Sequence, residues 1–426
     1  MTISFSKYSK AEKLAAIAEK TGFDPSVASI FSIADPKRQS LIDGISENTV
    51  ANYVLPYSVV PNMLVNNREY FVPMVTEESS VVAAASSAAK FWKSNGGFTS
   101  TVISVVKPGQ IHFLWKGHFE ELQRHFPAIK ITLEKAAEHL LEPMKRRGGG
   151  LVNIELLDFS NELPNYFQIR AGFVTADAMG ANLINSCLES MAKALTEFFK
   201  QAFTGEQADC EIIMAILSNH TPHCLVECYA ECPIAQLATV SGDLSAADFA
   251  RKFKTAVDIS HIDIYRAATH NKGIYNGVDA VVIATGNDFR AVEADGHSYA
   301  ARSGKYQGLS VVTLTEGRFR LSVKLPLALG TVGGLTTVHP LAAESLKMLG
   351  NPSAQDLMQI TAAVGLASHF SAIKALISTG IQHGHMKFHL NNILQLLGAT
   401  PEQQVSAQHY FAGKTITYRA VMEFLE

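Results

Sequence analysis

Hydrophobic positions repeat along this chain with two periods, one typical of helices and one typical of strands. Apolar residues spaced three or four apart predict amphipathic helices. The segments with this pattern are residues 9–20, 41–50 (the weakest), 119–144, 177–201 and 353–378. A further helix is predicted within residues 76–98, where Ser79 or Ser80 caps an alanine-rich interior and Gly96-Gly97 ends it.

Short apolar runs bounded by glycine, proline and polar turns predict strands. They occupy residues 55–65, 68–75, 106–117, 151–159, 166–176 and 211–219, and residues 223–234 are typical of a pair of strands. A hairpin is predicted over residues 310–329 with its turn at Glu316-Gly317. Residues 330–340 form a predicted glycine-rich loop, and the tail, residues 381–426, is expected to hold short helices.

The segment between Val106 and Ser218 has an organisation of its own. Its strands are interleaved with two helices, which predicts a small α+β unit of the split-βαβ, ferredoxin-like kind. An acidic pair, Glu77-Glu78, precedes this unit, and the polar stretch over residues 265–296 follows it. We therefore expect the small unit to be inserted into a larger one.

The stretch over residues 265–296 gathers more polar side chains than a plain structural loop needs. The polar set consists of Asn271, Lys272, Asn276 and Asp288. Between them lies an apolar run, Ala280–Ala284, which predicts a buried strand because glycines bound it on both sides. Asp288 would then leave the end of a strand, where loops often carry chemistry. A solvated turn with an incidental ion pair is the alternative.

Composition narrows the class of protein. Apolar residues make up 47% and charged ones 18% of the 426 residues, which is ordinary for a globular protein with two or three structural units. The formal net charge of -3 argues against nucleic acid or an anionic membrane as the main partner. Residues 1–20 lack the apolar core of a secretory signal, and no apolar run approaches the length of a membrane span. We expect a soluble, cytoplasmic protein.

A metal site is not expected. The five cysteines, in a chain with no export signal, predict reduced thiols. Three of them lie four apart between residues 224 and 232 and lack the close CxxC pairs of a zinc site. The histidines His383, His385 and His389 have no acidic neighbour on one helical face, so they are more typical of polar surface or substrate contacts.

The usual cofactor and hydrolase motifs are absent, because the sequence holds no GxGxxG, Walker A, GxSxG or HExxH pattern. In their place the segment Asp177–Asn182 (DAMGAN) starts a predicted helix. Its small residues allow a ligand close to the backbone, and a helix N-terminus suits a pyrophosphate. A small-residue helix start packed in a core is the alternative.

Four motifs taken together resemble those of one family. They are VPMVTEESS (72–80), DAMGAN, RAATHNKG with ATGND (266–288), and GHM (384–386). In this order they are similar to the motifs of 3-hydroxy-3-methylglutaryl-coenzyme A (HMG-CoA) reductase, and more narrowly to its soluble class II form, found mostly in bacteria. The resemblance extends from Glu47-Asn48 to His385. The chain departs from it at Ser79, where class II usually has proline, and after GHM, where it is only loosely similar.

The resemblance implies site residues at the matching motif positions. Catalytic roles fall on Glu78, Lys272, Asp288 and His385. Substrate contacts fall on Asn276 and on Ser80 and Arg266, which would hold the free carboxylate of the glutaryl group. Cofactor contacts fall on Asp177, Ala178, Met179, Gly180, Ala181, Asn182 and, with less motif support, Asn219.

These roles agree with the chemistry of reducing a thioester to an alcohol. Each of two hydride additions creates an oxyanion, which an ammonium such as Lys272 stabilises in a dry site. Glu78 can deliver a proton if Asp288 lies close enough to raise its pKa, although the helix dipole and Lys272 oppose that shift. His385 suits protonation of the departing coenzyme A thiolate.

The fold class expected is α+β, with three domains. A large mixed α/β substrate-binding domain spans residues 1–105 and 219–379, and the inserted small, non-Rossmann cofactor domain spans 106–218. A helical C-terminal flap, implied by the resemblance, spans 380–426. The resemblance also implies a homodimer with a shared active site, or a higher oligomer, and a mobile flap that closes over the site.

The implied ligands are HMG-CoA, mevalonate, coenzyme A and two equivalents of NADPH or NADH, with no metal. Lys145, Arg146 and Arg147 can meet a 2′-phosphate, which favours NADPH. The same three residues are equally typical of a solvated helix end.

Two other classes of function stay open. An acyl-CoA hydrolase or lyase would use Glu78 as a base without hydride transfer, but it leaves DAMGAN unexplained. A non-catalytic CoA-binding protein is disfavoured by the joint presence of Glu78, Lys272, Asp288 and His385.

Overall fold

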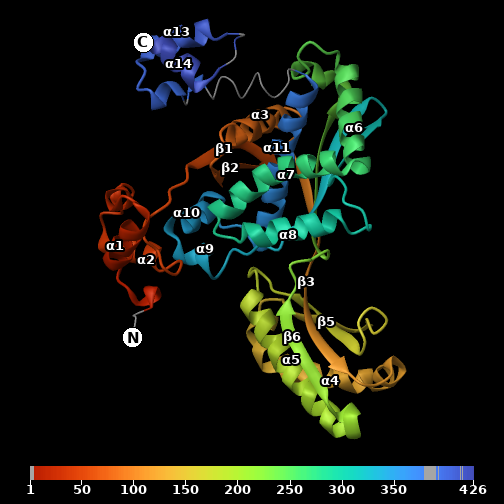
Figure 1. The fold of residues 1–426 in the computed structure, drawn as a ribbon. Helices are drawn as coiled ribbons and strands as arrows, with labels where there is room; N and C mark the ends of the chain where they lie inside the picture. The colour runs from red at the N-terminus through yellow and green to blue at the C-terminus, as the bar shows by residue number, and fades with distance from the viewer. Residues whose placement is uncertain (1–3, 379–389, 392, 413, 415) are drawn as a thin grey trace. The chain divides into compact units, whose positions relative to one another are not determined.

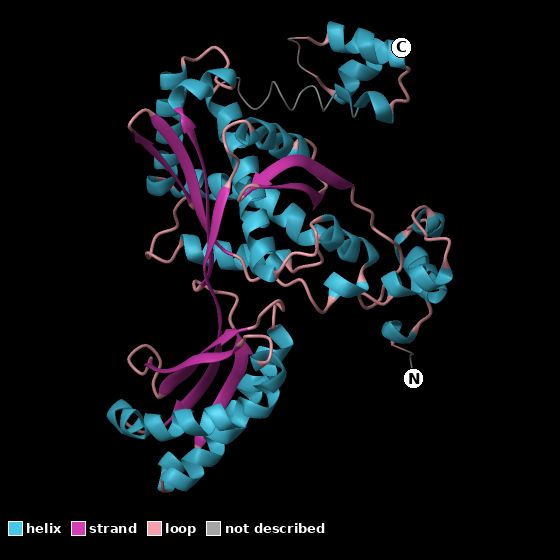
Figure 2. Cartoon of the chain, turned by 180° about the vertical axis from the view of Figure 1, so that it is seen from behind, coloured by secondary structure: helices cyan, strands magenta, loops and turns pink. Residues whose placement is uncertain are grey.

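The computed structural model describes residues 4–378, 390–391, 393–412, 414 and 416–426. The chain divides into two compact units, Met1–Pro56 and Tyr57–Glu426. Figure 1 gives the order of the elements along the chain, and Figure 2 distinguishes helices from strands. The fold is mixed α/β with antiparallel sheets, which confirms the predicted fold class at that level.

The first unit is made of short helices. They are η1 (Phe5–Lys7), α1 (Lys10–Thr21), η2 (Pro25–Ser29) and α2 (Pro36–Asp43). α1 confirms the helix predicted over residues 9–20, since Ser9 and Glu12 form a capping box at its start. α2 corrects the prediction over residues 41–50, because Asp35 caps a helix that begins with Pro36 and ends at Asp43.

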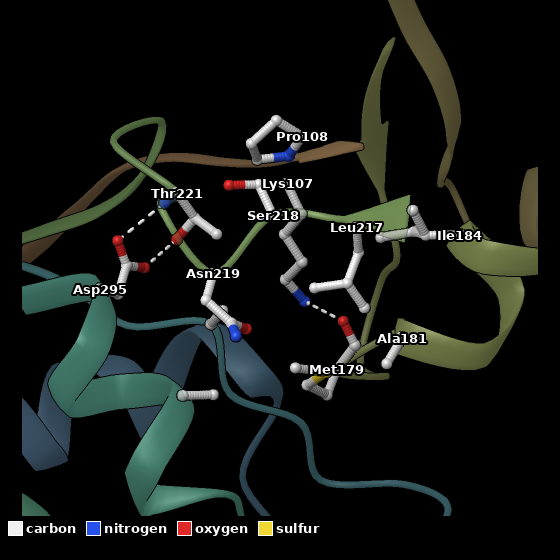
Figure 3. Close-up of a pocket in the computed structure, with 12 residues that line it drawn as sticks. Lys107, Pro108, Met179, Ala181, Ile184, Leu217, Ser218, Asn219, Thr221 and Asp295 are labelled. Carbon is white, nitrogen blue, oxygen red and sulfur yellow. Dashed lines mark hydrogen bonds between the residues drawn. The ribbon is translucent and has the colours of Figure 1, made fainter. Parts of the chain in front are cut away.

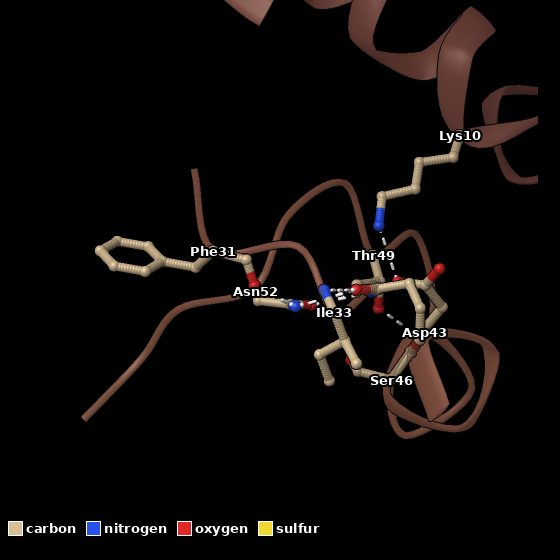
Figure 4. A network of polar contacts seen from close by, with 8 residues as sticks. Lys10, Phe31, Ile33, Asp43, Ser46, Thr49 and Asn52 are labelled. Atoms are coloured by element: carbon tan, nitrogen blue, oxygen red, sulfur yellow. Dashed lines mark hydrogen bonds and ion pairs between the residues drawn. The ribbon is translucent and has the colours of Figure 1, made fainter. Parts of the chain in front are cut away.

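Polar contacts hold this first unit together (Figure 4). The carboxylate of Asp43 accepts hydrogen bonds from Lys10 Nζ and Gln39 Nε2, both at 2.8 Å. The side-chain amides of Gln39 and Asn52 exchange two hydrogen bonds of 3.0 Å. Ala28 is the single buried residue among those that the structure describes here. With so little buried surface, this polar network fixes the local geometry.

The second unit contains two antiparallel sheets. β1 (Tyr57–Val65) and β2 (Arg68–Val75) form a two-stranded sheet and confirm two predicted strands. The larger sheet has seven strands in the order β4-β5-β3-β7-β9-β8, with β6 also paired to β3. Its strands are β3 (Thr99–Trp115), β4 (Gly150–Asp158), β5 (Tyr166–Val174), β6 (Cys210–Leu217), β7 (Cys224–Pro233), β8 (Ser310–Thr315) and β9 (Arg318–Pro326).

The long strand β3 serves two groups of strands in this sheet. Its first part, Thr99–Val105, pairs with β7, and its second part pairs with β5 and β6. β7 is one continuous strand, so the strand pair predicted over residues 223–234 is wrong. Every second residue of β7 faces the core, and this alternation resembles two short apolar runs in the sequence. β8 and β9 confirm the predicted hairpin, and Glu316 and Gly317 both have the positive φ that a tight hairpin turn requires.

The segment between Val106 and Ser218 has its own hydrophobic core. Its helices are α4 (Phe119–Lys145) and α5 (Ala181–Ala202), followed by η3 (Gly205–Ala208). The apolar faces of α4 and α5 pack with residues of β3–β6 into one cluster that includes Trp115, Phe167 and Phe199. The main cluster of the unit shares no residue with it. Periodicity therefore predicted the helices and strands of this segment well.

The main core lies around two long helices, α7 (Ile264–Ala284) and α11 (Ala354–Ile377). α7 corrects the prediction of a buried strand over Ala280–Ala284. That run ends a helix whose second half, from Gly273 onward, is buried on nearly all sides, and a fully buried helical segment lacks the polar face that marks helical periodicity. Asp288 therefore follows a helix, and it caps the next one, α8 (Phe289–Ala300).

The remaining elements connect and cover these parts. They are α3 (Val81–Lys93), η4 (Ile234–Thr239), α6 (Ala246–Ile262), α9 (Leu335–Val338), α10 (Pro340–Met348), α13 (Pro401–Tyr410) and α14 (Tyr418–Leu425). α9 interrupts the loop predicted over residues 330–340, whereas α13 and α14 confirm helices in the tail. By length and composition α11 could cross a membrane, contrary to the expectation from sequence, but 72% of its most apolar window is buried inside the protein.

Candidate active site

A cleft of about 410 Å³ opens between the start of α3, the middle of α7 and the end of α11. It brings together side chains from parts of the chain that lie 194 positions apart in sequence, as for Glu78 and Lys272. Among its lining residues are five of the predicted site residues, Glu78, Ser80, Arg266, Lys272 and Asn276.

The centre of the cleft is an ion pair. Lys272 Nζ donates to Glu78 Oε2 at 2.7 Å. The Lys272 side chain is 58% exposed and the Glu78 side chain 40% exposed. An ammonium and a carboxyl group are thus in direct hydrogen-bond contact in a cleft that solvent can reach. They can exchange a proton with a bound group or stabilise charge that develops on it.

Ser80 begins α3 in a strained conformation. Its φ is 78° and its hydroxyl makes no capping hydrogen bond, so the predicted capping role of Ser79 or Ser80 is wrong. Among the described residues, Ser80 Oγ is buried without a hydrogen-bond partner. A non-glycine residue in the left-handed region and an unpaired buried hydroxyl each cost about 1–3 kcal/mol. A ligand in the cleft that hydrogen-bonds to Ser80 would offset the second cost.

Two more cations line the cleft, Arg266 from α7 and Lys374 from α11. Burial lowers the pKa of each side chain from its ordinary value. In the part of the chain that the structure describes, neither lies within ion-pair distance of a carboxylate. The cleft therefore carries an excess of positive charge, which suits an anionic ligand.

The lining of the cleft also includes a buried histidine pair that the sequence analysis missed. Ser310 Oγ is 2.7 Å from His270 Nε2 and 3.0 Å from His369 Nε2, and the two imidazoles are in edge-to-face contact. Burial lowers the pKa of His369 to about 3 and lowers that of His270 as well, so both rings are neutral near pH 7. His270 stands within the RAATHNKG motif, but no sequence signal linked it to His369, 99 positions away.

Asp288 is not in this cleft. It lies beyond the far end of α7 from Lys272, and 284 − 272 = 12 helical residues correspond to about 18 Å along the axis. Its carboxylate accepts from the backbone amides of Arg290 and Ala291 and pairs with the Arg290 guanidinium at 3.1 Å. Burial raises the pKa of Asp288, but the contacts with Arg290 and Ala291 outweigh this and hold it below its usual value. Within one chain, Asp288 therefore does not neighbour Glu78, and the predicted proximity of the two carboxylates is untested.

The predicted cofactor segment, Asp177–Asn182, forms a turn that leads into α5. Gly180 is the residue before the helix, with φ 92°. Asp177 Oδ1 accepts the backbone N–H of Ala354 at 2.8 Å, which ties the turn to the start of α11. Around the turn is a small cavity whose lining includes Lys107, Met179, Ala181, Asn219 and Asp295 (Figure 3). The structure thus brings Asn219 next to the DAMGAN turn.

Part of the prediction falls outside the described residues. His385 lies there, as do His383 and His389. Among the residues that are described, no group of three or more histidine, cysteine or acidic side chains is arranged to hold a metal ion. All five cysteines are free and buried.

Comparison with known proteins assigns the chain to a family. The family model described as hydroxymethylglutaryl-coenzyme A reductase matches residues 9–390. The chain belongs to the HMG-CoA reductase family. It is 35% identical over 407 residues to the 3-hydroxy-3-methylglutaryl-coenzyme A reductase of Archaeoglobus fulgidus, covering 94% of this chain and 88% of that protein. It is 33% identical to a probable reductase of Borreliella burgdorferi, covering 82% and 78%.

Solved structures of reductase family members agree with this assignment. A class II reductase of Streptococcus pneumoniae bound to NADPH in open conformations is 38% identical, with a TM-score of 0.73, and the match covers 88% of this chain and all of that one. A further S. pneumoniae reductase structure matches 99% of both chains with a TM-score of 0.74 and 36% identity. The class II resemblance seen in the sequence is therefore confirmed, and the protein is an oxidoreductase of this family.

Proposed function

We propose that this reductase converts HMG-CoA to mevalonate and coenzyme A in the cytoplasm, as a step toward isoprenoids. The balanced reaction joins one thioester, two NAD(P)H and two protons to give one primary alcohol, one thiol and two NAD(P)⁺. The observation that carries the proposal is the cleft in which the Lys272–Glu78 ion pair stands beside Arg266, Ser80 and Asn276.

Each of the five predicted site residues in the cleft has a role in this proposal. Arg266 and Ser80 hold the glutaryl carboxylate, since the guanidinium has no carboxylate partner and the hydroxyl has no hydrogen-bond partner among the described residues. Asn276 orients the substrate. Lys272 stabilises the oxyanion that forms at the former carbonyl, and Glu78, 2.7 Å away, supplies or takes a proton.

The residues around the DAMGAN turn fit a nicotinamide cofactor. Gly180 has no side chain that could cap α5, so the first-turn N–H groups of this 22-residue helix make no capping hydrogen bond. They can donate hydrogen bonds to a pyrophosphate. Asp177 to Asn182 and Asn219 would hold the cofactor, which supplies the hydride. The NADPH bound to the S. pneumoniae relative favours NADPH over NADH for this chain.

The position of Asp288 argues for an active site shared between two copies of the chain. Asp288 caps α8, and one turn further along the same helix Ala291 lines the cavity at the DAMGAN turn. Lys272 and Glu78 stand at the middle of α7, away from Asp288. If Asp288 acts on the same substrate, a second copy must supply it together with its cofactor turn. We therefore propose a homodimer, of which each site takes one part from each subunit.

Separate hydrophobic cores support the proposed small domain and the main part of the large one. A small cofactor domain covers residues 106–218, a discontinuous substrate domain covers 1–105 and 219–379, and a C-terminal flap covers 380–426. His385, on the flap, would protonate the coenzyme A thiolate as it leaves, and closure of the flap would exclude water from the exposed Lys272–Glu78 pair.

The test is the absorbance of reduced nicotinamide with purified protein and HMG-CoA, run in parallel with NADPH and NADH. Consumption of two reduced cofactors for each coenzyme A released is the expected result. Release of coenzyme A without oxidation of cofactor would instead establish a hydrolase or lyase. Binding of HMG-CoA with neither event would leave a CoA-binding protein.

A further inference from the structure

We propose that Lys107 is a positioning residue for the nicotinamide cofactor. Its buried ammonium contacts the backbone between Thr175 and Gly180, and it thereby holds the DAMGAN turn in the shape that presents backbone amides to the pyrophosphate. This inference rests on the proposed function, since it takes Asp177–Asn182 as the cofactor turn. Lys107 belongs to none of the four sequence motifs and lies within a strand, β3, whose pattern gave no sign of chemistry.

The contacts of Lys107 are specific. The residue is 6% exposed, and its Nζ donates to Thr175 Oγ1 at 2.7 Å and to Ala178 O at 2.9 Å. It also donates to Met179 O at 3.0 Å, the contact drawn in Figure 3. Thr175 Oγ1 in turn donates to Ala178 O at 2.6 Å, so it accepts from Lys107. Three donated hydrogen bonds use all three N–H groups of an ammonium. A neutral amine has only two such groups, and this geometry therefore needs the charged form.

These contacts orient the backbone of the turn. A trans peptide unit is planar, with its C=O and N–H on opposite sides. Because the Met179 carbonyl points at Lys107, the N–H of Gly180 in the same peptide unit points away from it. That N–H joins the uncapped amides at the start of α5, and among the described residues none of them has a recorded hydrogen-bond partner. Lys107 thus turns one more donor toward the place where the helix dipole favours an anion.

The charge on Lys107 has no counter-ion within the described residues. Asp295 lines the same cavity, but its two carboxylate oxygens accept from the backbone N–H and the hydroxyl of Thr221. Burial lowers the pKa of Lys107, which reflects the free-energy cost of keeping the cation there. A pyrophosphate bound at the start of α5 would bring negative charge close to this cation and offset that cost.

The direct test is Lys107→Met, which keeps the length of the side chain and removes its charge and donors. Binding of NADPH to the dimer is measured without turnover by titrating its fluorescence, and the dissociation constant is expected to rise about 10- to 100-fold, the range for losing hydrogen bonds from a charged group. The KM for HMG-CoA and the kcat at saturating NADPH are expected to stay near the wild-type values. A residue that only stabilises the fold would not separate the two ligands in this way.

Lys116→Met is the matched control. Lys116 lies just beyond the end of β3, and its exposed ammonium pairs with Glu206 at 3.3 Å, so this variant removes one positive charge without touching the turn. Its dissociation constant for NADPH is expected to equal that of the wild type. An equal rise in both variants would overturn the proposal, because it would reduce the effect to net charge.

Thr175→Val keeps the test decisive if Lys107→Met does not fold. It removes the hydroxyl shared by Lys107 and the turn while keeping the volume of the side chain. Thr175→Val is expected to weaken NADPH binding, Thr175→Ser to preserve it, and the double variant with Lys107→Met to be less than additive. Unchanged NADPH affinity in a folded Lys107→Met or in Thr175→Val would overturn the role of Lys107. Wild-type protein that oxidises no cofactor would overturn the proposed function as well.

Discussion

The cleft at Lys272 and the proposed cofactor turn differ in how they hold positive charge. In the cleft the side chain of Lys272 is 58% exposed and holds one partner, Glu78, by one 2.7 Å contact. At the turn Lys107 is 6% exposed and is fixed by three hydrogen bonds to Thr175, Ala178 and Met179. The Lys272 ammonium is open to water and able to change partners, whereas the Lys107 ammonium is buried and uses all its donors within the protein.

This difference in exposure determines how strong the charge interactions of each lysine are. A charge interaction at 4 Å is worth about 1 kcal/mol in bulk water and about 4 kcal/mol at the effective dielectric of a protein surface. Lys272 therefore acts strongly only when a bound ligand excludes water from the cleft. Lys107 needs no ligand for this, because the fold alone has removed water from it. Substitutions in the two regions test this contrast between an exposed and a buried lysine.

Lys272→Met should have the largest effect. It removes the donor to the developing oxyanion, and kcat is expected to fall about 10²- to 10³-fold. The dissociation constant for NADPH should be unchanged, because the cofactor turn is built without Lys272. Lys254→Met, which removes an exposed lysine of α6 paired with Asp258, is the control and should retain full activity. A loss of NADPH affinity in Lys272→Met would contradict the expectation that the two regions act independently.

Mixing two inactive variants should restore activity if the site is shared. Lys272→Met and Asp288→Asn protomers are unfolded or dissociated together, reassociated and assayed. Half of the dimers are then hybrids with one intact site out of two, so about a quarter of the wild-type activity is expected. If Lys272 and Asp288 of one chain served the same site, every hybrid site would carry a mutation and activity would stay at the level of the single variants.

Arg266→Met should raise the KM for HMG-CoA about 10- to 100-fold, because a charge-assisted contact with the glutaryl carboxylate is lost. Arg266→Lys keeps the charge without the planar fork and should recover part of the affinity. NADPH affinity measured by fluorescence should be the same in all three proteins. An unchanged KM in Arg266→Met would show that the excess positive charge of the cleft serves some other anion.

Asp295→Asn should produce a small change in stability that depends on pH. Burial raises the pKa of Asp295 from 3.8 to about 6. Since the folded state holds this proton more tightly than the unfolded one, the wild type loses stability as the pH rises from about 4 to about 6. The asparagine variant, which still offers Thr221 an acceptor, lacks this loss, which is on the order of 2 kcal/mol. Urea unfolding of both proteins at pH 4 and pH 7 measures it, and parallel curves would refute it.

Sequence patterns anticipated much of this molecule. The alternation of strands and amphipathic helices predicted β3–β6, α4 and α5 in order, and β3, α4 and α5 each have one buried face. The motifs placed Glu78, Arg266 and Lys272 in one site before any geometry was known, and the structure brings them into one cleft. Periodicity failed over Ala280–Ala284, because the second half of α7 is buried on nearly all sides and has no polar face to reveal its period.

The residue types and their local spacing were therefore enough to indicate the family, most of the elements and the chemical identity of the groups in the cleft. Only the tertiary structure decided which groups meet. It set Asp288 beyond the end of α7 and away from Lys272, buried the His270–His369 pair in the lining of the cleft and placed Lys107 in contact with the proposed cofactor turn. The physical reason is that burial and distance depend on packing between segments far apart in the chain, and no local pattern records them.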